Sequence, residues 1–180
     1  MKKVLFFIAI IPNAEICAEV TQFKEYAAQH FNSSRALTSP PHITLIPPFR
    51  WEPKQTQYLE EVLKGFVHSQ PSFYLGLENF DCFAPRVIFV KPKESKALAT
   101  LQQVLKSTLE KQLNLSYRDH HGFHPHMTIA FKDLKAAIFP KAWAHYEQVE
   151  YIRYFKVEQL SLLQHNGERW LTRSNFPLIT

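Results

Sequence analysis

Two short stretches of the chain alternate between apolar and polar residues, and this alternation is typical of a strand with one buried face. The first is Pro41-His42-Ile43-Thr44-Leu45, and the second is Pro125-His126-Met127-Thr128-Ile129, placed 126 − 42 = 84 residues later. Side chains two positions apart on a strand share a face, so each histidine should point the same way as its threonine. The apolar residues between them should anchor each strand in the core.

Apolar runs and helical spacings surround the two motifs in the same order. Val4 to Ile11 and Val87 to Val90 are apolar runs that each precede a motif by a similar interval, and we interpret both as buried strands. Apolar residues at spacings of three and four predict helices from Asn13 to about Asn32, from Pro53 to about Val67, and from about Glu94 to Leu113. The order strand, helix, motif strand, helix, strand is therefore expected twice.

This repeated order predicts one α+β domain over residues 1–180, built from two pseudo-symmetric halves of approximately 1–84 and 85–180. Pro47-Pro48 should end the first motif strand, and Tyr154 to Leu163 should form one strand. Asn166-Gly167 is a strong hairpin signal that should join that strand to a last strand from Trp170 to Arg173.

The beginning of the chain has some features of a secretory signal, because Met1-Lys2-Lys3 precedes an apolar run. That run is short for such a segment and far too short to span a membrane. It also has an internal counterpart in Val87 to Val90, which a cleaved leader would not be expected to mirror. We therefore interpret it as a strand and expect a cytoplasmic protein without a membrane partner. Cys17 and Cys82 are too few for a disulfide framework.

The motifs bring two imidazoles and two hydroxyls, a set suited to acid/base chemistry around an anionic oxygen centre. A histidine with an unperturbed pKa of about 6.5 has both protonation states accessible near neutrality. One copy can accept a proton while the other donates one, and the threonine hydroxyls can donate hydrogen bonds to phosphate-like oxygens. Either motif alone is a common pattern whose residues simply share the wet side of a strand. The matched pair favours catalysis.

The two copies resemble the motifs of the two-histidine (2H) phosphoesterases, and among these the bacterial 2'-5' RNA ligase-like proteins. Both copies fit the pattern of histidine, hydrophobic, Thr or Ser, hydrophobic, and the resemblance covers nearly the whole chain. It implies two antiparallel sheets flanked by helices, with the motifs facing each other across a central cleft. It also implies His42, Thr44, His126 and Thr128 as catalytic residues.

The activity that this resemblance implies is hydrolysis or ligation at a phosphodiester without a metal or another cofactor. The substrate would be RNA or a nucleotide with a 2',3'-cyclic phosphate or a 2'-5' linkage. The chain has no Gly-x-x-x-x-Gly-Lys loop, so we do not expect ATP use. A net charge of +5 favours anionic partners, although a basic protein need not bind them. We expect a monomer.

Several further residues are candidates for binding the substrate. Arg50 follows the first motif, and Lys132 follows the second at a place where the family often has an arginine. Tyr117, Arg118 and Phe123 precede the second motif and are expected along one wall of the cleft.

Two other kinds of protein remain as alternatives. A non-catalytic RNA or nucleotide binder would keep the cleft without turnover. A metal-dependent enzyme is suggested by the histidines between Tyr117 and His126, but that stretch lacks cysteine and is not expected to form a helix that would present a His-x-x-x-His pair. We therefore expect no metal site.

Overall fold

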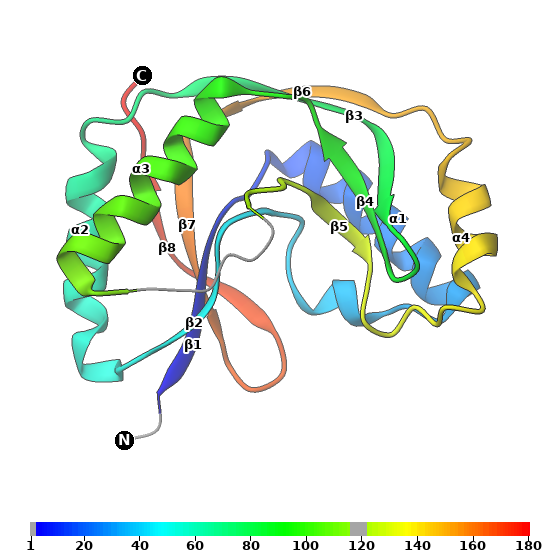
Figure 1. The fold of residues 1–180 in the computed structure, drawn as a ribbon, viewed down its shortest axis with the longest axis horizontal. Helices are drawn as coiled ribbons and strands as arrows, with labels where there is room; N and C mark the ends of the chain where they lie inside the picture. The colour runs from blue at the N-terminus through cyan, green and yellow to red at the C-terminus, as the bar shows by residue number, and fades with distance from the viewer. Residues whose placement is uncertain (1–2, 116–121) are drawn as a thin grey trace.

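The strands form two four-stranded antiparallel sheets in the computed structural model, which describes residues 3–115 and 122–180 (Figure 1). The first sheet contains β1 (Val4–Ile10), β2 (Ile43–Trp51), β7 (Gln159–His165) and β8 (Trp170–Pro177) in the order β2-β1-β7-β8. The second contains β3 (Phe73–Phe83), β4 (Val87–Pro92), β5 (Met127–Ala130) and β6 (Ile152–Val157) in the order β5-β4-β3-β6. The two motif strands, β2 and β5, are therefore edge strands, and they contact each other between the sheets.

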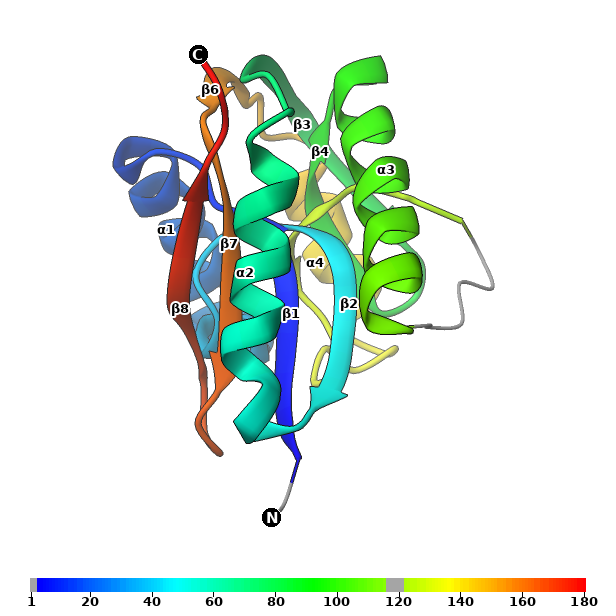
Figure 2. The same cartoon turned by 90° about the vertical axis from the view of Figure 1, so that its left-hand side faces the viewer.

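Two of the helices pack against a strand of the sheet that does not contain the strand preceding them in the chain. The helices are α1 (Ala14–Phe31), α2 (Thr56–Val67), α3 (Lys96–Leu113) and α4 (Phe139–Tyr146), with short 3-10 turns η1 (Arg35–Thr38) and η2 (Pro53–Gln55). α1 follows β1 in the chain but contacts β5 of the other sheet, whereas α3 follows β4 but contacts β2. Figure 2 shows α2 in front of the first sheet, with its axis roughly along the strands, and α3 on the same side of the molecule. None of the described helices is long and apolar enough to cross a lipid bilayer.

One continuous hydrophobic core connects the two sheets and all four helices. The apolar residues of the motifs belong to it, because Ile43 and Met127 are fully buried. The motif strands are thus anchored from behind, as the alternation predicted, and the α+β architecture of two antiparallel lobes flanked by helices is confirmed.

Two predicted strand boundaries are wrong. β2 continues through Pro47-Pro48 to Trp51, because an edge strand has an open side on which the missing N–H groups need no partner. Tyr154 to Leu163 covers two strands, β6 and β7, which pair with β3 and β1 respectively. The chain crosses from one sheet to the other there without a glycine or proline to mark the crossing. The hairpin at Asn166-Gly167 is confirmed, since β7 pairs with β8.

The cap of α1 gives a first testable prediction. The Asn13 side chain accepts a hydrogen bond from the Ile16 N–H at 3.0 Å, as a helix N-cap does. Asn13→Ala should lower the free energy of unfolding by about 1 kcal/mol, measured by urea denaturation. The control is Asn32→Gly at the other end of α1, where φ is 53° and glycine fits without strain. An unchanged free energy of unfolding in Asn13→Ala would show that the cap contributes nothing.

Candidate functional site

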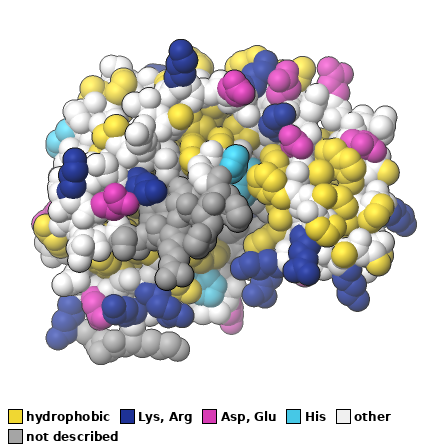
Figure 3. Space-filling model, in the orientation of Figure 1, with side chains coloured by type: hydrophobic (Ala, Val, Ile, Leu, Met, Phe, Trp, Pro, Cys, Tyr) yellow, Lys and Arg dark blue, Asp and Glu magenta, His cyan; other side chains and the backbone are white. Residues whose placement is uncertain are grey.

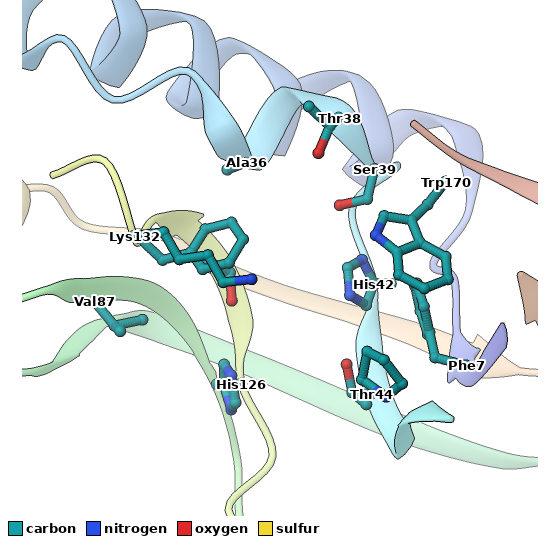
Figure 4. A pocket seen from close by; sticks show the side chains of 13 residues that line it. Phe7, Ala36, Thr38, Ser39, His42, Thr44, Val87, His126, Lys132 and Trp170 are labelled. Carbon is teal, nitrogen blue, oxygen red and sulfur yellow. The ribbon is translucent and has the colours of Figure 1, made fainter. Parts of the chain in front are cut away.

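A pocket of about 290 Å³ lies between the two sheets and brings both motifs together (Figure 4). All four motif residues line it, namely His42, Thr44, His126 and Thr128. In Figure 4 the imidazoles of His42 and His126 lie on opposite sides of the open space, with Thr44 close to His42. A substrate placed in the pocket can therefore be reached from both motifs.

The histidines lie at the start of the two edge strands. His42 comes one residue before β2, and His126 comes one residue before β5. The alternation holds across this boundary, because Thr44 and Thr128 are half-buried on the pocket side. Both pairs of histidine and threonine line the same pocket, so the polar faces of the two motif strands are directed to the space between the sheets.

The two imidazoles are held in the same way. Nδ1 of His42 lies 2.7 Å from the carbonyl oxygen of Pro40, and Nδ1 of His126 lies 2.7 Å from that of His124. A carbonyl oxygen can only accept a hydrogen bond, so each Nδ1 carries the hydrogen. In the neutral ring, Nε2 is then unprotonated and available as a base.

Aromatic packing supports each imidazole. The ring centroid of His42 lies 4.8 Å from that of Phe7, and the centroid of His126 lies 5.4 Å from that of Phe89. Phe7 and Phe89 are both buried, on β1 and β4, the neighbours of the motif strands. Each is backed in turn by a further aromatic ring at 4.6 Å, from Trp170 and Phe83 respectively.

Burial lowers the pKa of both histidines. Loss of hydration is the main cause that lowers the pKa of His42 from 6.5 to about 4; the Pro40 carbonyl opposes this shift, and the positive charges of Lys24 and His126 add to it. Loss of hydration also lowers the pKa of His126, against the effect of the His124 carbonyl. The electrostatic coupling of His42 to His126 fits their shared pocket, and both rings favour the neutral form at pH 7.

Of the predicted binding residues that the structure describes, Lys132 lines this pocket. Its backbone has φ of 57°, which is uncommon for a residue other than glycine. This turn at the end of β5 directs its amine toward the space between the histidines (Figure 4). The amine can therefore attract an anionic group to the pocket.

The other predicted binding residues lie elsewhere. Arg50 is exposed near the far end of β2, opposite Leu5 of β1, and lines a separate hollow. Phe123 packs partly buried against the core and does not line the pocket. Tyr117 and Arg118 lie outside the described residues.

The pocket also contains residues that the motifs did not indicate. Phe7 and Trp170 form an apolar side next to His42, and Thr38 and Ser39 supply hydroxyl groups above it (Figure 4). From the sequence, Trp170 was expected only as the first residue of the last strand. Phe7 lies within an uninterrupted apolar run, so its sequence context gave no sign of a pocket.

One face of the molecule shows where charges gather (Figure 3). In Figure 3, histidine side chains reach the surface near the middle of the face, next to hydrophobic side chains. Lysine and arginine side chains gather along the lower edge of the same face. Within residues 3–115 and 122–180, no three His, Cys, Asp or Glu side chains cluster as metal ligands do.

The fold is similar to that of several solved structures, all of them under 25% identical in sequence. E. coli LigT complexed with 3'-AMP superimposes with a TM-score of 0.69 at 19% identity, over 99% of this chain and 100% of that chain. TT0787 of Thermus thermophilus gives 0.68 at 17% identity over 97% of each chain. A crystal structure of a phosphoesterase gives 0.65 at 20% identity over 100% of each chain.

Sequence comparison extends this likeness beyond the fold. A search of curated proteins found no match. The family model of the 2'-5' RNA ligase superfamily, in contrast, matches residues 12–169, a range that includes both histidine motifs. The chain therefore belongs to the 2'-5' RNA ligase superfamily, and its resemblance to the two-histidine phosphoesterases is confirmed.

Proposed function

We propose that the protein is a metal-independent phosphoesterase that acts on nucleotides or RNA with a 2',3'-cyclic phosphate or a 2'-5' linkage. The observation that carries the proposal is the pair of imidazoles on opposite sides of one pocket, each with Nδ1 bound to a carbonyl. Complexes of E. coli LigT with 3'-AMP, ATP and NADP+ support a nucleotide as the class of ligand.

Hydrolysis of a cyclic phosphate requires one proton to leave water and one to reach the departing ribose oxygen. Nε2 of one neutral histidine accepts the water proton while the new P–O bond forms. Nε2 of the other, protonated histidine donates to the ribose oxygen as the old P–O bond breaks. Thr44, Thr128 and Lys132 hold the non-bridging oxygens. When the hydroxyl of a second strand takes the place of water, the same two proton transfers join the cyclic phosphate end to that hydroxyl without ATP.

A substrate panel tests this function. Purified protein is incubated with 2',3'-cyclic nucleotides and 2'-5'-linked oligonucleotides in the presence and absence of EDTA, and the products are separated by chromatography. We expect turnover of at least one substrate at the same rate with and without EDTA. Binding without turnover would indicate a nucleotide-binding protein, and loss of turnover with EDTA would indicate a metal-dependent enzyme. Either result would contradict the proposal.

The lowered pKa values predict where activity is greatest. The active pair needs one neutral and one protonated imidazole, so the acidic limb of kcat/KM should lie near pH 4. The alkaline limb should lie below the ordinary histidine value of 6.5. A bound phosphate favours the protonated ring, so the alkaline limb of kcat should lie at higher pH than that of kcat/KM. A kcat/KM that still rises above about pH 8 would contradict this pairing.

A further inference from the structure

The segment from Ser33 to Pro40, here called the wall segment, connects α1 to the first motif and forms one side of the pocket. Ala36, Thr38 and Ser39 line the pocket directly. The carbonyl at the end of the segment, on Pro40, holds Nδ1 of His42. The position of this segment therefore affects both the shape of the pocket and the orientation of one imidazole.

Lys24 of α1 holds the middle of the wall segment. Its side chain is buried, with the residue 2% exposed, and its amine donates to the carbonyls of Ala36 at 3.1 Å and Ser39 at 3.0 Å. Taking a charged amine out of water is costly unless hydrogen bonds compensate it. Carbonyls that turned away from Lys24 would leave the ammonium without these partners, so the segment is held firmly.

Asp133, which follows β5 of the second sheet, holds the beginning of the wall segment. Its carboxylate accepts from the hydroxyl of Ser33 and from the backbone N–H groups of Ser34 and Arg35, each at 2.8 Å. Asp133 directly follows Lys132, the pocket residue after the second motif. The same turn therefore places a pocket amine and fixes the wall opposite it.

We propose that Lys24 and Asp133 are positioning residues of the active site, which fix the wall segment between the two motifs and so keep the Pro40 carbonyl on His42. Lys24 has a second effect on the site through its charge. The positive charge of Lys24 is one of the causes that lower the pKa of His42. The inference rests on the proposed function only in the kinetic part of its test, because kcat/KM can be measured only if the protein turns over a substrate.

Titratable and charged groups lie on several sides of Lys24. Burial lowers the pKa of Lys24 to about 8, and Cys17 on the same helix opposes this shift. His42 lies beyond the wall segment, with His126 across the pocket, and Arg169 lines a neighbouring hollow together with Lys24. The amine of Lys24 is therefore mostly protonated at pH 7, and its positive charge lowers the pKa of His42 more than the charge of His126 does.

The test compares Lys24→Met, Lys24→Arg and Asp133→Ala with the exposed-lysine control Lys64→Met. Lys24→Met and Asp133→Ala should each lower kcat/KM by about 10²-fold, because a displacement of about 1 Å at a catalytic group has an effect of that size. Lys24→Arg should restore part of the loss, and Lys64→Met should match the wild type. The pKa of His42, followed by NMR of its ring protons, should rise in Lys24→Met and stay low in Lys24→Arg.

The His42 pKa distinguishes charge from simple loosening of the wall. Loosening alone would hydrate the ring and raise the His42 pKa in Asp133→Ala as well. We expect a smaller rise in Asp133→Ala than in Lys24→Met, because Asp133→Ala keeps the positive charge of Lys24 and removes a negative charge. Wild-type kcat/KM and an unchanged His42 pKa in Lys24→Met would overturn the proposal.

Folding and substrate choice do not obscure the result. Circular dichroism establishes that each variant is folded, and if Lys24→Met is not, wild-type kcat/KM in Asp133→Ala overturns the proposal. The NMR readout needs no substrate, so the effect of Lys24 on His42 is measured even if no cyclic phosphate is turned over. Failure of the proposed function and failure of this inference therefore give different results.

Discussion

His42→Ala and His126→Ala should each lower kcat by about 10²–10⁴-fold, the contribution of one positioned acid or base. Each substitution removes one of the two imidazoles that line the pocket and that we propose as the proton-transfer groups. The double variant should be little worse than the less active single variant, because one remaining imidazole cannot complete the proton cycle. Steady-state kinetics on the substrate identified from the panel measures the loss, and titration calorimetry with a nucleotide product shows whether binding is retained.

The matched control for these variants is His68→Ala. His68 is exposed at the C-terminal end of α2 and lies outside the pocket. The His68→Ala variant should keep the wild-type kcat, because it removes a histidine without changing the pocket. A single variant at His42 or His126 with kcat within about twofold of the wild type would rule out its role as an acid or base.

Thr44→Val and Thr128→Val should each lower kcat by about 10²-fold, the effect of removing one hydrogen-bond donor from a developing anion. Valine has nearly the shape of threonine, so the strand and the core behind it should be unaffected. If the hydroxyl acts mainly in the transition state, kcat and kcat/KM fall together while KM changes little. Single-turnover kinetics separates this loss from any change in product release.

Thr172→Val on β8 is the control for the threonine variants. Thr172 is exposed on a strand and does not line the pocket. Valine there should leave both kcat and the free energy of unfolding close to those of the wild type. A rise in KM alone in Thr44→Val or Thr128→Val would instead assign the hydroxyl to binding of the ground state.

The central part of the site was predictable because its pattern is local. A strand with one buried face alternates, so Ile43 and Met127 indicated which way the histidines and threonines point. β1 has no such alternation, because it lies inside its sheet and Phe6, Phe7 and Ile8 are all buried. The face that Phe7 presents to the pocket therefore has no signature in the sequence.

The supporting contacts depend on tertiary structure. Nothing local indicates that α1 packs on the sheet of the second half, or that Asp133 reaches Ser33. Lys24 is one turn beyond Val20 on the buried stripe of α1, yet a lysine on a helix is usually solvated. Lys24 can be buried because its amine donates to the carbonyls of Ala36 and Ser39, and these carbonyls reach it only when the wall segment is folded.

The most direct test of the two-histidine site follows both imidazoles as a phosphate binds. Protein with 15N-labelled histidine is titrated with 2'-AMP and with 3'-AMP, and the ring nitrogens of His42 and His126 are observed by long-range NMR correlation. We predict that the Nε2 signals of both residues shift together with one dissociation constant, while both Nδ1 atoms stay protonated. A shift at only one histidine, or different dissociation constants for the two, would contradict a single phosphate held between them.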